Sequence, residues 1–246
     1  MRTIKKLPPP AALTQWRGPR LARNRGEGME CTYDEMRRDR STLEAVEEGL
    51  LQEQGGLCAY TGVRIHLDEG ERRTVNFHLE HLIPQKHCTY GQDADYGNLA
   101  ACWPAPNCAF EPGFGARKKG DWPSPAESHL FVSPLDSRCT ARFTFNHRGE
   151  IAAADQGDDA AKETIRRLGL DDRTLTELRR SAIHGALNPA SRQLKLKDAH
   201  KLLRHMDEDA ARLDRGESVR LQPFCFAIRP ALAREIRKLE GIMRQK

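Results

Sequence analysis

The spacing of apolar residues changes along this chain, and that change constrains the fold more than any other feature. From residue 156 onward, apolar residues recur every three or four positions in segments that begin near Asp159, Leu175, Lys197 and Pro230. Between residues 57 and 122 they fall in short pieces separated by turn-forming residues. A period near 3.6 indicates amphipathic helices, whereas short turn-bounded pieces indicate short strands and loops. The sequence therefore predicts an α+β fold, mostly α, with a compact loop-rich module ahead of a helical region.

Two further segments carry local signals. Residues 41–54 start with Ser41 followed by Glu44, the spacing of a capping box, and a helix there is expected to end at Gly55 and Gly56. Residues 142–152 alternate apolar and polar side chains around a turn and predict a small hairpin. In the last segment, Pro230 is expected in the first turn of the final helix, with Leu232, Ile236, Leu239 and Met243 facing inward.

These patterns divide the chain into a basic N-terminal arm (1–40), a central module (41–155) and a helical C-terminal region (156–246). The arm contains many Lys and Arg residues interleaved with Pro and Gly. It fits a solvated arm or one that contacts phosphate or a partner, and the sequence leaves both open. We find no linker long enough to separate independent domains.

The net charge indicates which kind of partner to expect, and the cysteine content indicates the cellular compartment. Lys and Arg total 40 against 35 Asp and Glu, a formal charge of +5, which favours polyanionic partners without requiring them. The seven cysteines are scattered, as expected of thiols or metal ligands in a reducing compartment. No segment has the length and hydropathy of a membrane span or a secretory signal. We therefore expect a cytoplasmic protein with no membrane association.

The stretch FHLEHLIPQK, residues 77–86, places His78, Glu80 and His81 inside an apolar run that ends at Pro84. Polar groups beside apolar ones are costly to bury unless they are paired, hydrogen-bonded or bound to a metal. An asparagine in YGNLAAC and a Lys-rich RKKGD follow farther along the chain. A carboxylate, an imidazole, an amide and cations are the groups that metal-assisted phosphodiester hydrolysis requires. An ordinary polar pair at a strand end is the alternative for Glu80 and His81.

The order LEHLIPQ, YGNLAAC and KKGD resembles the HNH endonuclease motif, a strand-strand-helix (ββα-metal) finger that holds one catalytic metal. MRTIKKLPPPAALTQWR, LQEQGGLCAYTGVRI and RFTFNHRGEI also resemble segments of the PtuB-like HNH proteins of Septu and retron-associated antiphage defence. The resemblance implies an HNH finger embedded in a helical scaffold. It makes His81 the general base, Glu80 a ligand of a divalent cation such as Mg²⁺, and Asn98 the residue that holds the metal-bearing loop.

The chain departs from this pattern at the zinc-binding positions. Such fingers are often stapled by zinc on two Cys-x-x-Cys pairs. Here Cys58 and Cys102 are present, but their companions are Thr61 and Gly115. We therefore expect the structural zinc to be absent, with Cys58 and Cys102 as residual ligands. Free buried thiols are the simpler outcome, and a site rebuilt with Cys88 or Cys108 is the alternative.

The third motif residue, usually His, Asn or Asp, falls on Ala116, which cannot bind a metal. We expect Asn107, in the insertion WPAPNCAFEPGF, to replace it, and Asp121 is a second candidate. Phosphate contacts are expected from the basic run after the insertion: Arg117, Lys118 and Lys119.

The sequence thus predicts a metal-dependent HNH endonuclease that acts on nucleic acid, DNA or tRNA, in antiphage defence. A degenerate finger that binds nucleic acid or a partner without cleavage is the alternative. The resemblance implies an ABC-type ATPase subunit of the PtuA kind as a partner, since this chain has no P-loop. It leaves open whether a retron reverse transcriptase and its DNA join the complex.

Overall fold

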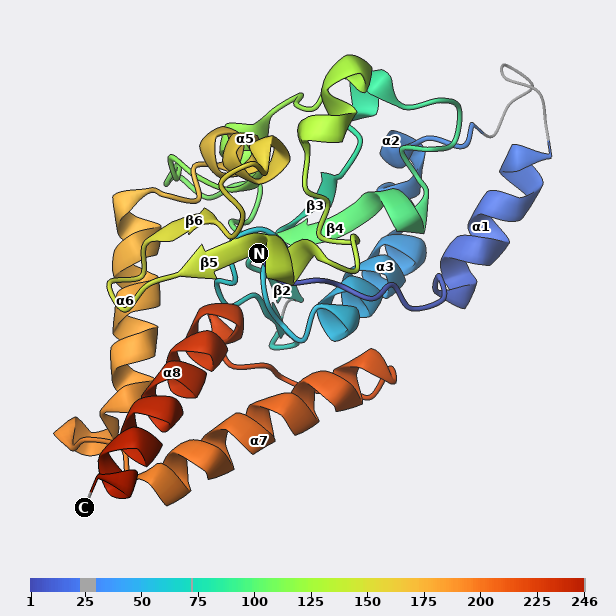
Figure 1. Ribbon diagram of the computed structural model, residues 1–246. Helices are drawn as coiled ribbons and strands as arrows, with labels where there is room; N and C mark the ends of the chain where they lie inside the picture. The colour runs from blue at the N-terminus through green and yellow to red at the C-terminus, as the bar shows by residue number, and fades with distance from the viewer. Residues whose placement is uncertain (23–29, 72, 246) are drawn as a thin grey trace.

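The computed structural model describes residues 1–22, 30–71 and 73–245. The α-helices in this part of the chain are α1 (Ala11–Leu21), α2 (Tyr33–Met36), α3 (Arg40–Glu53), α4 (Ala116–Lys119), α5 (Asp159–Leu168), α6 (Arg173–Leu187), α7 (Leu196–Asp214) and α8 (Cys225–Arg244). The strands form antiparallel pairs: β1 (Leu67–Asp68) with β2 (Thr74–Val75), β3 (His78–His81) with β4 (Leu99–Cys102), and β5 (Phe143–Phe145) with β6 (Ile151–Ala153). The predicted α+β fold, mostly α, is confirmed (Figure 1).

The helix expected over 41–54 forms as α3, but its N-cap differs from the prediction. The side chain of Asp39 accepts a hydrogen bond from the Thr42 amide, and the Ser41 hydroxyl donates to Asp39 instead of capping the helix. Asp39 wins because it stands at the last non-helical position, where a side-chain oxygen reaches the first free amides. The expected end is confirmed, since Gly55 and Gly56 follow with positive φ angles.

Over residues 1–22, the N-terminal segment packs against the body of the protein. Leu13 and Trp16 of α1 are buried, and α1 packs on α3. Lys6 links α3 to β4: its Nζ donates to Glu53 of α3 at 2.7 Å and to the Leu99 carbonyl of β4 at 2.7 Å. The segment is rich in charged residues, but the apolar residues between them are buried, and this burial stabilises its packing. The segment 23–29 lies outside the described residues.

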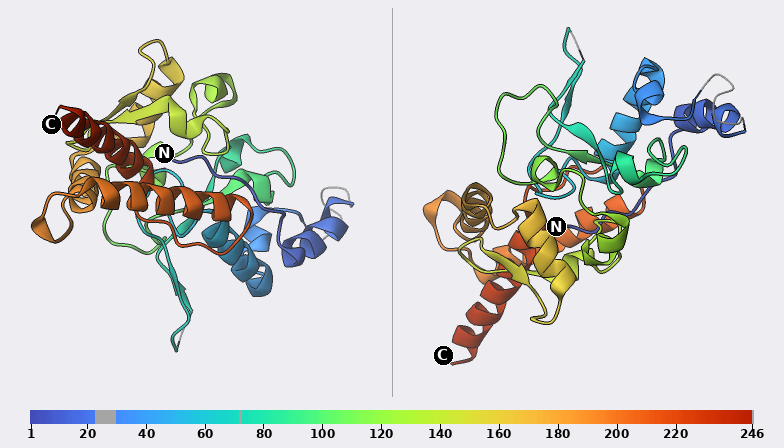
Figure 2. Two further views of the ribbon diagram at one scale, coloured as in Figure 1. Left: turned by 60° about the horizontal axis from the view of Figure 1, so that its bottom comes forward. Right: turned by 90° about the horizontal axis from the view of Figure 1, so that it is seen from above.

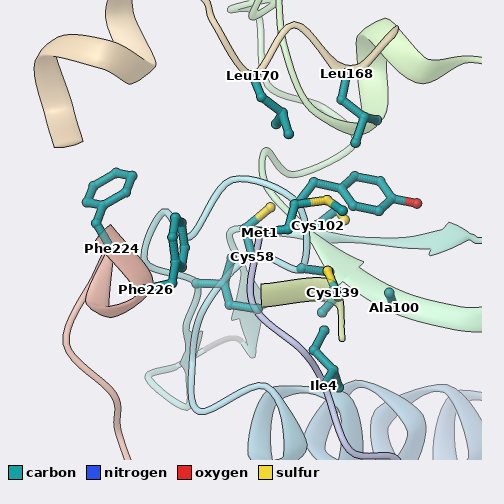
Figure 3. Packing of buried hydrophobic residues seen from close by; sticks show 14 of the residues in the cluster. Met1, Ile4, Cys58, Ala100, Cys102, Cys139, Leu168, Leu170, Phe224 and Phe226 are labelled. Carbon is teal, nitrogen blue, oxygen red and sulfur yellow. The ribbon is translucent and has the colours of Figure 1, made fainter. Parts of the chain in front are cut away.

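One hydrophobic cluster joins the predicted central module to the helical region. It runs from Met1 through Cys58 and Cys102 to Leu168 and Ile236, so the three sequence-defined regions share a core. Figure 3 shows Cys58, Cys102 and Cys139 among apolar side chains from distant parts of the chain. The β1–β2 hairpin, in contrast, projects from the body (Figure 2).

The four C-terminal helices form where the apolar spacing predicts them, apart from one boundary. The last helix, α8, starts at Cys225, so Pro230 lies inside it and not in its first turn. Buried Phe226 and Ile228 precede the proline, and their packing offsets the backbone hydrogen bond that proline cannot donate. Met243 is 65 % exposed because the end of α8 extends away from the body (Figure 2).

Within the part of the chain that the structure describes, we find no helix long and apolar enough to cross a membrane.

Candidate functional site

The hairpin β3–β4 carries the residues singled out from the sequence. Its register pairs Glu80 with Ala100 and His81 with Leu99. Side chains alternate between the two faces of a strand, so Glu80 and His81 point to opposite faces of the hairpin. The site must therefore be described one face at a time.

His81 is 8 % exposed and held in one orientation by its neighbours. Its Nε2 lies 2.9 Å from the backbone carbonyl of Asp93, and the ring of Tyr33 packs edge-on at a centroid distance of 4.6 Å. A carbonyl can only accept, so we assign the proton to Nε2 and the lone pair of the neutral ring to Nδ1. Burial lowers the pKa of His81, which favours this neutral form. A neutral imidazole with a free lone pair can act as a base.

Asn98 holds the loop that joins β3 to β4. Its Oδ1 accepts from the Ile83 amide at 2.7 Å, and its Nδ2 donates to the carbonyls of Ile83 and Gln92 at 3.1 and 3.3 Å. The backbone carbonyl of Asn98 accepts from Leu82 at 2.9 Å. Asn98 is the last residue of a short 3-10 helix (Tyr96–Asn98) and directly precedes β4. Its side chain is fully used in fixing the turn after His81.

Glu80 lies on the other face, in an ion pair with Lys119. The Lys119 Nζ is 2.8 Å from Glu80 Oε1 and donates to the His81 carbonyl at 2.9 Å. The Lys119 side chain is only 1 % exposed, against 14 % for Glu80. Tyr60 and His78 complete the surroundings, at 3.4 and 3.9 Å from the carboxylate. Burial raises the pKa of Glu80, and the charge of Lys119 opposes that rise.

The three residues of the predicted phosphate-binding run have different surroundings. Lys119 is buried and ties α4 to β3, so in this arrangement it does not reach a surface phosphate. Arg117 donates to the carbonyls of Ala105 and Pro106 and steadies the insertion. Lys118 is exposed, with no hydrogen bond or ion pair to any residue in the described ranges.

The candidate replacements for the missing third ligand lie at the surface. Asn107 is exposed in the insertion between β4 and α4. Asp121 forms an exposed ion pair with Lys86 at 2.8 Å. Ala116, at the motif position itself, is buried at the start of α4.

These donors do not make a ready metal site. Glu80 is paired with a lysine on the face opposite His81, and the Asn98 amide oxygen is occupied by a backbone amide. Over residues 1–22, 30–71 and 73–245 there is no group of three or more His, Cys, Asp or Glu side chains that could hold a metal ion. The residues as arranged do not fit a preformed divalent-cation centre.

The four positions that correspond to the two cysteine pairs of the HNH resemblance, Cys58, Thr61, Cys102 and Gly115, nevertheless lie close together. The thiols of Cys58 and Cys102 are hydrogen-bonded to each other, and Thr61 also bonds the Cys58 thiol. A side chain added at Gly115 would come within 3.2 Å of the Thr61 methyl group. Burial raises the pKa of Cys102 strongly, whereas for Cys58 the hydrogen bonds outweigh burial and lower its pKa to about 6. Two thiols, one hydroxyl and a glycine leave two of four ligand positions without a zinc-binding group.

Sequence reasoning missed three residues that shape the site. Tyr33 and Asp93 position the His81 ring, and Tyr60 contacts the Glu80 carboxylate. Asp93 also accepts from the Tyr33 amide at 2.9 Å, which locks α2 against the loop. Asp93 acts on His81 through its backbone carbonyl, so its residue type gave no signal. Tyr60 lies 20 positions from Glu80 and Tyr33 lies 48 positions from His81, separations that local patterns do not report.

A comparison with models of protein families and a comparison with curated proteins both found no match for this chain.

Proposed function

We propose that the protein is an HNH-type endonuclease that hydrolyses phosphodiester bonds in nucleic acid, with His81 as the general base. The observation that carries the proposal is the fixed, neutral His81 ring, whose Nε2 is bonded to the Asp93 carbonyl and whose Nδ1 retains a lone pair. A base oriented by a carbonyl, beside a loop clamped by Asn98, is suited to deprotonating a water molecule. The motif resemblance assigns these roles to the same two residues.

The proposal includes dependence on a divalent cation, expected to be Mg²⁺, because the resemblance to HNH endonucleases implies one. When bound, such an ion would polarise the scissile phosphate and stabilise charge on the leaving oxygen. Because the described donors do not form a preformed centre, we assign no step of the reaction to the ion. The chain's own contribution is the base, the clamped loop and exposed Lys118 as a phosphate contact.

One observation favours a second function, a finger that binds nucleic acid or a protein without cutting. Glu80, the expected metal ligand, is neutralised by Lys119 instead of facing His81. In this second function the hairpin keeps its fold through the ion pair and has lost the chemistry.

The biological setting is also part of the proposal. We propose an effector of antiphage defence that acts on DNA or tRNA together with an ABC-type ATPase. The helical region, with exposed apolar residues such as Leu178 and Met243, would provide the docking surface.

A cleavage assay separates the two functions. Wild type, His81→Ala and His66→Ala are incubated with plasmid DNA and with tRNA, with Mg²⁺ or Mn²⁺ or with EDTA, alone and with the ATPase. His66 is exposed and lies outside the hairpin, so it controls for loss of a histidine. We expect wild type and His66→Ala to cut only with the cation, and His81→Ala to lose at least about 100-fold in rate.

The pH profile provides a second readout of the base. Because the pKa of His81 is lowered, the neutral form persists below the ordinary range, and the rate should fall only at more acidic pH. Cleavage by His81→Ala at the wild-type rate would remove the assignment. Salt-sensitive binding of nucleic acid without cleavage, under every condition, would favour the second function.

A further inference from the structure

A cavity of about 800 Å³ lies away from the β3–β4 hairpin, between α7, the start of α8 and the N-terminal segment. Figure 1 shows α7 alongside α8 and joined to it by the segment 215–224. Leu202 and Met206 of α7 and Phe226 of α8 give the cavity an apolar wall. A volume of this size and a partly apolar lining are typical of sites for small organic ligands.

The remaining lining is strongly basic. Five cationic side chains line the cavity with two carboxylates: Arg2, Lys5, Arg64, Arg220 and Arg229 with Asp209 and Asp214. Arg229 is paired at 2.6 Å with Asp207, which lies outside the lining, so the excess is two positive charges. Asp214 lies 3.5 Å from Arg2, and Asp209 lies 3.5 Å from His205. Asp214 is therefore paired within the cavity wall, and Asp209 has a cationic neighbour in Arg212 at 3.6 Å, outside the lining.

Two of the arginines, Arg64 and Arg220, have no carboxylate partner among the described residues, and Arg2, although paired with Asp214, has one buried nitrogen that is not hydrogen-bonded. Arg64 donates to the backbone carbonyls of Gly55, Gly56 and Leu221, and it has no carboxylate partner in the described ranges. Arg220, whose charge lies close to Arg64, forms no hydrogen bond or ion pair with any described residue. The Nη1 of Arg2 is buried without a hydrogen-bond partner. Burial lowers the pKa of both Arg2 and Arg64, and the charge of Arg220 lowers that of Arg64 further.

The start of α8 adds to the positive electrostatic potential in the cavity. The helix has 20 residues, its first two turns line the cavity at Cys225 and Arg229, and its N-cap, Phe224, provides no side-chain hydrogen bond. The N-terminus of a long helix carries partial positive charge and favours an anion. An anion in the cavity would relieve the repulsion between the arginines and satisfy the buried Nη1 of Arg2.

We propose that this cavity binds an organic phosphate of nucleotide size, with its phosphates toward Arg2, Arg64 and Arg220 and its organic body against Leu202, Met206 and Phe226. The apolar wall distinguishes this ligand from inorganic phosphate, which would leave that wall unfilled. The site is separate from His81 and stands independently of the proposed nuclease function.

Calorimetric titration of the full chain tests the proposal, with EDTA present so that no metal complex contributes. The probes are ATP, AMP and inorganic pyrophosphate. We expect saturable binding of ATP at one site, with weaker binding of AMP because it brings fewer charges to the arginines. Pyrophosphate should also bind more weakly than ATP because it lacks the organic body.

Two variants locate the site. Arg220→Glu, at an exposed position, should weaken ATP binding at least about tenfold, which corresponds to about 1.4 kcal/mol. Leu202→Trp should fill the apolar end and weaken ATP more than pyrophosphate. Arg180→Glu makes the same charge change on the exposed face of α6, outside the cavity, and should leave binding within about twofold of wild type.

The absence of saturable binding of all three probes at millimolar concentration would overturn the proposal. Equal weakening by Arg220→Glu and Arg180→Glu would also overturn it, because binding would then follow net charge and not the cavity. Equal affinity for pyrophosphate and ATP would refute the role of the apolar wall.

Discussion

Removing the charge of Lys119 should show how much this side chain contributes to the stability of the candidate site. Lys119→Met keeps the length of the side chain and deletes its charge, which leaves the Glu80 carboxylate without its partner at 2.8 Å and the His81 carbonyl without its donor at 2.9 Å. Breaking a buried ion pair from one side typically costs about 3–5 kcal/mol. Because the Glu80 side chain is 14 % exposed and can take up a proton, we expect a loss near the lower end, about 3 kcal/mol.

Urea unfolding followed by circular dichroism measures this loss. For a chain of this size, about 3 kcal/mol corresponds to a shift of about 1 M in the urea midpoint. The matched control is Lys118→Met, the same substitution one residue earlier at an exposed position, which should change stability by no more than about 0.5 kcal/mol. Adding Glu80→Gln to Lys119→Met removes the stranded charge and should recover at least about 1 kcal/mol.

The pH dependence follows from the direction of the Glu80 shift. Burial raises the pKa of Glu80 in the folded state, and without Lys119 nothing comparable opposes that rise. A group whose folded pKa is raised favours the folded state below its unfolded pKa, and that contribution is lost as the pH rises through the folded value. The deficit of Lys119→Met should therefore be smallest in acid and grow toward neutral pH. Equal small losses for Lys119→Met and Lys118→Met would refute the reasoning.

Three further outcomes are expected. Asn98→Ala should cost about 2–3 kcal/mol in urea unfolding, because it leaves backbone groups of the β3–β4 loop unpaired, and hydrogen exchange should locate the loss in that loop. Gly149→Ala should cost at least about 2 kcal/mol, because Gly149 has a φ of +78° and a Cβ there would lie 2.3 Å from the Thr176 carbonyl. Elemental analysis of purified protein should find no stoichiometric zinc; one zinc per chain, lost when Cys58 and Cys102 are replaced by serine, would show that the site has been rebuilt.

Much of the architecture could be predicted from local patterns. The apolar spacing located α5, α6 and α7, the alternation in residues 142–152 located β5 and β6, and Gly55 with Gly56 marked the end of α3. Periods of 3.6 and 2 reflect which face of a helix or strand is buried, so they are visible in the sequence itself. Helix α8 starts earlier than the proline signal predicts, because the burial of Phe226 and Ile228 stabilises its early turns.

For the candidate site, too, some features follow from the sequence and others only from the tertiary structure. The sequence by itself singles out His81 and Asn98 by residue type, whereas the strand register of the structure shows that Glu80 and His81 point to opposite faces. Only the tertiary structure decided that Lys119 turns inward to Glu80, that Asp93 orients His81 through its backbone, and that the positions of the broken cysteine pairs converge. The same holds for the basic cavity, whose arginines come from residue 2, residue 64 and residue 220. Such contacts join residues far apart in the chain, and they depend on how whole elements pack against one another, which the period of a local pattern does not encode.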